Sequence, residues 1–118
     1  MDRIEEIKIL IERNSKAIDK YSIKIQEIKS ELNYIDSRIK WIPASDLDEK
    51  GERRASRMAN DYISLGEAKK IVKEEQVLEQ KKKRELVQLE LENTILEKEN
   101  LKKENTLLRL ELDEIKNK

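Results

Sequence analysis

A seven-residue hydrophobic repeat runs without interruption through the first part of the chain, and it constrains the fold more than any other feature. Its positions are separated alternately by three and four residues, with no glycine or proline between them. The repeat consists of Ile4, Ile7, Ile11, Asn14, Ile18, Tyr21, Ile25, Ile28, Leu32, Ile35, Ile39 and Ile42. This spacing predicts a coiled-coil helix whose stripe must be covered by another helix, from the same chain or from a second copy.

The composition favours long helices over a compact globule. Charged residues make up 44% of the chain and aromatic residues 3%, and there are only 2 glycines and 1 proline. Chains of this composition with helical periodicity form coiled coils, whereas disordered chains lack apolar residues at regular spacing. We therefore predict an all-α fold of two long helices. They would form a coiled coil or antiparallel helical hairpin that associates into a homo-oligomeric bundle.

Charge and hydropathy restrict the surroundings of the protein. The 26 basic and 26 acidic residues balance, so no global field draws the chain to nucleic acid or to an acidic membrane. There is no cysteine, which fits a reducing compartment. The longest apolar run, residues 9–11, is far too short for a membrane span. We expect a cytoplasmic location, in the producing or the host cell, and no membrane partner.

The chain divides into three segments by sequence. Residues 1–42 form the N-terminal coiled-coil helix, which ends because the residue before Pro43 is displaced from the α region. Residues 43–64 lose the repeat and form a connector that contains a short basic helix starting near Glu52. Residues 65–118 form the C-terminal helix, which has no proline.

Two interpretations describe the start of the C-terminal helix. Ser64 and Glu67 match a capping box, in which each residue satisfies a backbone N–H of the other. Alternatively, one continuous helix runs from Met58 onward and tolerates Gly66 in its interior.

The C-terminal helix carries two apolar stripes on nearly opposite sides, which predicts contact with two neighbouring helices. The first stripe includes Leu101, Asn105, Leu108, Leu112 and Ile115. The second includes Leu89, Leu96 and Leu107. One amide between leucines is typical of a parallel dimer zipper, so we assign the first stripe to a partner subunit. The second stripe is assigned to the N-terminal helix of the same chain.

Two arrangements of the chain fit these stripes. In a hairpin dimer the two long helices pack antiparallel within the chain, and in an elongated rod each helix associates with its own copy. Isoleucine at both the a and the d positions disfavours a simple parallel dimer. A four-helix bundle of two hairpins is consistent with that preference. We favour the hairpin dimer, with trimers and tetramers as alternatives. Asn14 and Asn105 either fix the register and stoichiometry of the helices, which we favour, or lie at a frayed or exposed stretch.

The sequence offers no catalytic or metal-binding pattern. It contains no histidine and no cysteine, which removes the usual general base, the thiol nucleophile and the common zinc ligands. The glycines stand alone and form no phosphate-binding loop. Glu74 and Glu75 lack a third acidic residue at the spacing of a helical magnesium site. We expect a protein that is not an enzyme and holds no cofactor or metal.

Two aromatic side chains are candidate partner contacts. Tyr34 and Trp41 lie one heptad apart, outside the main stripe. They would either close the hairpin against Met58 and Tyr62 or anchor a partner protein, because tyrosine and tryptophan dominate interface hot spots.

Three arginines of the connector, Arg53, Arg54 and Arg57, are the other candidate contacts. They would either bind nucleic-acid phosphates electrostatically or form ion pairs with the acidic residues just upstream. Those acidic residues are Asp46, Asp48 and Glu49. The basic run 81–84 is spread around its helix and is interpreted as a solvated stretch.

Together these patterns predict a non-catalytic coiled-coil protein that oligomerises and binds another macromolecule as a scaffold, adaptor or inhibitor. The expected partners are a second copy of the chain and another protein. The alternative is a nucleic-acid-associated accessory protein, a small packaging or regulatory subunit, that uses the basic residues of the connector.

Overall fold

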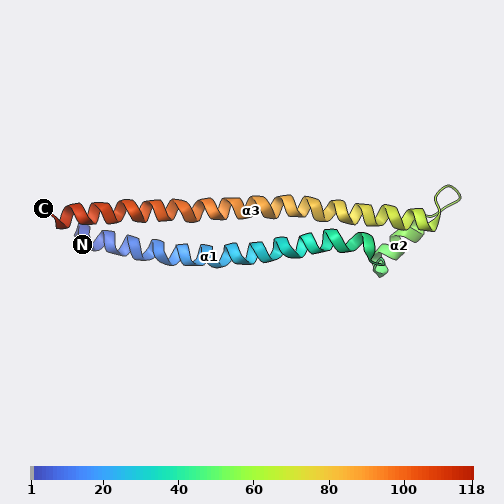
Figure 1. Cartoon of the computed structure of the whole chain (residues 1–118), viewed down its shortest axis with the longest axis horizontal. Coiled ribbons are helices and arrows are strands. Elements are labelled where there is room, and N and C mark those ends of the chain that lie inside the picture. The colour runs from blue at the N-terminus through green and yellow to red at the C-terminus, as the bar shows by residue number, and fades with distance from the viewer. Residues whose placement is uncertain (1) are drawn as a thin grey trace. The chain divides into compact units, whose positions relative to one another are not determined.

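The computed structural model describes residues 2–118, and these residues form helices and no strand, so the predicted all-α class is confirmed (Figure 1). Helix α1 spans Arg3–Trp41, the 3-10 helix η1 spans Ile42–Ala44, α2 spans Glu49–Met58 and α3 spans Leu65–Lys116. None of these helices has both the length and the apolar content that crossing a membrane requires.

The ends of the first two helices follow local sequence signals. Pro43 lies in η1 directly after α1, as expected from its position after the heptad repeat. Helix α2 begins at Glu49 rather than near Glu52, because Asp48 caps it. The Asp48 carboxylate accepts a hydrogen bond from the backbone N–H of Gly51 at 2.8 Å, which satisfies one of the free donors of the first turn.

A turn separates α2 from α3, so the capped start of α3 is correct and the single continuous helix is wrong. The Asn60 side chain accepts hydrogen bonds from the backbone N–H groups of Tyr62 and Ile63 at 2.8 and 2.9 Å. The Ser64 hydroxyl then accepts from the N–H of Glu67 at 3.1 Å, which is the serine half of the predicted capping box.

The chain forms two compact units, and each contains a part of α1 and a part of α3. The first unit consists of Met1–Lys29 and Leu89–Lys118, and the second of Ser30–Gln88. All twelve positions of the heptad repeat in residues 4–42 are buried or half-buried. The stripe predicted from the repeat is therefore the side of α1 that packs.

In the first unit α1 and α3 run antiparallel (Figure 1). Arg3 donates two hydrogen bonds to the Glu111 carboxylate at 2.8 and 2.9 Å, and Lys24 lies 3.8 Å from Glu90. The hydrogen bonds from Arg3 lower the pKa of the Glu111 carboxyl below its ordinary value. Because the pKa falls on folding, this pair stabilises the unit at neutral pH, and the contribution is lost as acid protonates Glu111.

Two amides lie inside the helix–helix seam of the first unit. Asn105 is 1% exposed, and its Nδ2 donates to the Ile11 carbonyl and the Ser15 hydroxyl, both at 3.3 Å. Asn14, on the same turn of α1, is 7% exposed. Neither Asn14 Nδ2 nor Asn105 Oδ1 has a hydrogen-bond partner among the described residues. A buried polar atom without a partner costs about 1–3 kcal/mol, so these amides reduce stability.

Replacing both amides by leucine, Asn14→Leu with Asn105→Leu, should therefore stabilise the protein. We expect the free energy of unfolding to rise by about 1–3 kcal/mol, because the substitutions remove two unpaired polar atoms from the buried seam. Thermal and urea unfolding followed by circular dichroism measures the change. Asn33→Leu, at an exposed position of α1, is the control and should give only a small gain from helix propensity. A lower midpoint for the double variant would contradict the expectation.

In the second unit, α2 packs onto the start of α3 through small side chains. Ala55 and Ala68 are 0% exposed and Val72 is 1% exposed. Around them lie the partly buried side chains of Leu47, Met58, Ala59 and Ile63. Small residues at the contact let two helix backbones approach closely, so this core has little room for added volume.

Ion pairs join the two helices at the rim of this core. Arg54 donates two hydrogen bonds to the Glu75 carboxylate at 2.8 and 3.0 Å, and Lys69 Nζ lies 3.3 Å from Glu52. All four side chains are partly exposed, so each pair contributes little free energy compared with the buried core.

Ala55→Leu should destabilise the second unit, because extra methyl groups in a closely packed contact force α2 away from α3. Overpacking of this kind costs about 1–3 kcal/mol. The measurement is the midpoint of urea unfolding, compared with that of Ser56→Leu. Ser56 is the next residue of the same helix and is exposed, so its replacement should change the midpoint little. Equal effects of the two substitutions would exclude the close α2–α3 contact.

Candidate functional site

The two stripes of α3 have the opposite roles from those expected. Leu91, Asn105 and Leu108 are 8%, 1% and 8% exposed and belong to the unit formed with α1. The remaining members of this stripe that were assigned to a partner subunit, Leu101, Leu112 and Ile115, are half-buried. In the structure this stripe packs against α1 of the same chain, so its assignment to a second subunit is wrong.

Polar residues of the two helices lie beside each other in this contact. Asn14 interrupts the isoleucine stripe of α1, and Asn105 interrupts the facing stripe of α3 beside the same turn. Placing a polar residue next to another polar residue costs less than placing it against leucine. The zipper-like pattern around Asn105 is therefore used within the chain.

The other stripe of α3 remains uncovered in the first unit. Leu89, Leu96, Leu107 and Leu110 are 55%, 58%, 66% and 56% exposed. Their assignment to the contact with α1 is wrong, since the opposite side of α3 makes that contact. With the intervening polar residues they continue a strict heptad repeat, which we call the leucine row. The row consists of Leu89, Asn93, Leu96, Asn100, Lys103, Leu107 and Leu110.

Glutamates border the leucine row on both sides. In heptad terms Asn93, Asn100 and Leu107 occupy a positions, and the other members of the row occupy d positions. The e positions form the edge nearer to α1, the inner edge, and the g positions form the outer edge. The inner edge consists of Glu90, Glu97, Glu104 and Glu111. The outer edge consists of Glu92, Glu99 and Thr106.

Side chains of α1 reach the inner edge. Besides the contacts of Arg3 and Lys24 described above, Glu97 accepts a hydrogen bond from the Tyr21 hydroxyl and thereby raises the pKa of Tyr21. On the outer edge, Glu99 lies 3.5 Å from Lys102 of the same helix. The leucine row is thus an apolar stripe between two acidic edges. The glutamates recur at seven-residue intervals in the sequence, and this spacing is the signal from which the acidic edges could have been predicted.

Charges placed on the two stripes of α3 should have opposite consequences for folding. Leu91→Lys with Leu108→Lys buries two ammonium groups against α1, so we expect loss of helicity and a fall of several kcal/mol in unfolding free energy. Leu96→Lys with Leu107→Lys changes only exposed positions and should leave helicity and the unfolding midpoint nearly unchanged. Circular dichroism of the two double variants tests this. The reverse result would restore the assignment expected from the sequence.

A second candidate site is a groove of about 700 Å³ in the second unit. The three arginines predicted as contacts all line it, and they are joined by two further basic residues and three acidic ones. The basic residues are Arg38, Lys50, Arg53, Arg54 and Arg57. The acidic residues are Asp48, Glu75 and Glu79. The structure therefore brings the connector arginines together with carboxylates rather than on a purely basic surface.

Two of these arginines already have acidic partners. Arg53 lies 3.7 Å from Glu49, as the ion-pair interpretation expected. Arg54 instead binds Glu75 of α3, and this contact raises the pKa of the Arg54 guanidinium and lowers that of the Glu75 carboxyl. Glu75 lies 21 residues from Arg54 in the sequence, so spacing alone did not reveal the pair.

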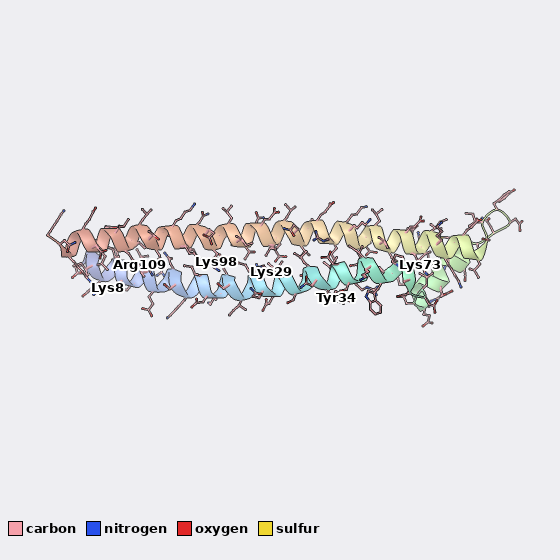
Figure 2. All side chains as sticks on the ribbon, in the orientation of Figure 1. Lys8, Lys29, Tyr34, Lys73, Lys98 and Arg109 are labelled. Carbon is pink, nitrogen blue, oxygen red and sulfur yellow. The ribbon has the colours of Figure 1, made fainter. Side chains whose placement is uncertain are left out.

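The aromatic candidates lie on the surface. Tyr34 and Trp41 are 63% and 65% exposed, and Tyr62 is 93% exposed. Figure 2 shows Tyr34 on the side of α1 that faces away from α3. Closure of a hairpin by Trp41 is wrong, because Ile42 takes the buried stripe position and the preceding residue points about 100° away from it.

The basic run 81–84 contributes contacts inside the second unit. Arg84 Nε donates to Asp36 at 2.6 Å, and Lys83 lies 4.0 Å from Glu31. Both bonds join α3 to α1, so at least these two cations take part in the fold.

Comparison of the chain with protein-family models, with curated proteins and with solved structures finds no match. In residues 2–118 no three His, Cys, Asp or Glu side chains gather in a way that could hold a metal ion. The surfaces described above are therefore the guide to what the protein binds.

Proposed function

We propose that this chain is a non-catalytic interaction protein that binds another protein by docking one of its helices on the leucine row. In this role it acts as an adaptor, a scaffold or an inhibitor. The observation that supports the proposal is the second heptad stripe of α3, whose four leucines are each more than half exposed. A heptad stripe gains free energy only when another helix covers it.

We also propose that α1 and α3 form one helical hairpin. This is supported by the antiparallel contacts in each unit taken separately, such as Arg3 with Glu111 and Asp36 with Arg84. In a hairpin α1 covers one side of α3 and leaves the leucine row free for an outside helix. A second copy of the chain is one candidate for that helix, as expected from the sequence.

A designed peptide tests the docking proposal. The probe is a helix of about four heptads with leucine at its core positions, asparagine opposite Asn93 and Asn100, and glutamine on both flanks. We expect it to bind the full chain, as measured by fluorescence anisotropy with the peptide alone as a reference. Binding should fall at least about tenfold in Leu96→Lys with Leu107→Lys, because the row then carries two additional charges. Equal binding by the wild-type chain and the variant would refute the proposal.

The alternative, a nucleic-acid-associated accessory protein, would use the groove of the second unit. Five basic side chains line this groove, and that observation favours it. The three carboxylates in the same groove repel phosphate, and Arg54 is already bound to Glu75. We therefore rank nucleic-acid binding second.

We expect the chain not to retard duplex DNA in a gel at low salt, since the groove holds its own counter-charges. Phosphate contacts weaken steeply as salt is added, so a genuine complex would disappear as the salt concentration is raised. The matched variant is Arg53→Glu with Arg57→Glu. A retarded band that is lost both with salt and in this variant would favour the alternative function.

A further inference from the structure

We infer that the helix docked on the leucine row carries lysine or arginine along both of its flanks. The partner is then a basic amphipathic helix of another protein rather than a second copy of this chain. The inference rests on the proposed function, because it names the occupant of the same row.

The argument starts from the edges of the row. In a two-stranded coiled coil, the e and g residues of one helix face those of the other, and their charges select the partner. On α3, all four positions of the inner edge and two of the three positions of the outer edge are glutamates. Neither edge contains a basic residue. The surface that receives the partner is therefore acidic along both sides.

A second copy of the chain would bring these carboxylates together. In a parallel dimer Glu92 faces Glu97 and Glu99 faces Glu104, and symmetry repeats each pair on the other side. In an antiparallel dimer like edges face each other, so glutamate again meets glutamate. Like charges across a helix interface act against a partner, whereas opposite charges support it.

Ion pairs within the chain offset only part of this charge, and on the outer edge Glu99 lies 3.5 Å from Lys102. Arg3 pairs with Glu111, and Lys24 lies 3.8 Å from Glu90. The contact of Glu97 is with the Tyr21 hydroxyl, which is uncharged at neutral pH and therefore offsets no negative charge. The middle of the inner edge, at Glu97 and Glu104, therefore keeps its negative charge beside the row, and cationic side chains of a partner complement it.

The core positions of the row add two requirements on the partner. Asn93 and Asn100 occupy successive a positions, where an amide is best matched by another amide. Lys103 occupies a d position, where a carboxylate would neutralise it. A parallel partner helix thus has leucines at most core positions, two amides, one acid and basic flanks.

Two more versions of the designed peptide test the charge of the partner. They keep the core residues of the first peptide and carry either lysine or glutamate at all flank positions. At low salt we expect the full chain to bind the lysine-flanked peptide about a hundredfold more tightly than the glutamate-flanked one. The ratio should shrink as salt is added, because the flanking charges are exposed to solvent.

Charge substitutions in the chain provide the matched control. In Glu92→Lys with Glu99→Lys, affinity for the lysine-flanked peptide should fall about tenfold and affinity for the glutamate-flanked peptide should rise. Glu5→Lys with Glu27→Lys changes net charge equally at exposed positions of α1 and should alter neither affinity more than about twofold.

The outcomes separate this inference from the proposed function. If the glutamine-flanked peptide binds through the row but the lysine-flanked peptide binds no better, the charge inference is wrong and the docking proposal stands. If no peptide binds, the docking proposal itself fails. Sedimentation of the wild-type chain as a dimer that Leu96→Lys with Leu107→Lys abolishes would identify a second copy as the occupant and overturn the inference.

Discussion

The isoleucine stripe of α1 is the constraint on which the rest of the structure depends. Each buried isoleucine contributes about 1.5–3 kcal/mol relative to exposure, so a helix with such a stripe is stable only beside another helix. The chain supplies that helix itself in both units, through the inward stripe of α3. The connector also buries apolar side chains against α3. In the second unit it folds into α2, whose alanine contact with α3 occupies little space.

Polar contacts then accompany the side of α3 that faces α1. Apolar content alone does not discriminate, because both stripes contain several leucines at heptad spacing. Asn105 lies beside the turn of α1 that contains Asn14, and Arg3 and Lys24 reach glutamates at the border of the interface. These contacts contribute little stability each, but together they distinguish one side of the helix from the other.

Features set by local periodicity could be predicted from the sequence, and features set by contacts between distant residues could not. The stripe of α1 was readable because burial of Ile7 or Ile35 is dictated by local periodicity. Which side of α3 faces α1 could not be predicted, since the contacts on that side join residues some ninety positions apart, such as Ile11 and Asn105. The core at Ala55 and Ala68 was not predicted, because alanine is only weakly hydrophobic and adds little to a hydrophobic pattern. In the groove, Glu75 was missed because its pairing with Arg54 depends on how α2 docks on α3.

The carboxylates of the inner edge of the leucine row lie between α1 and the place of a docked helix, so the two helices draw on the same charges. When a cation from outside approaches Glu111 or Glu90, it competes with Arg3 or Lys24 for the carboxylate oxygens. Occupancy of the row and the tightness of the α1–α3 pairing are then thermodynamically linked, and linkage acts equally in both directions. A substitution at Arg3, which lies outside the row itself, would thus tune how strongly the proposed partner is held, and α1 would then regulate the surface that it leaves uncovered.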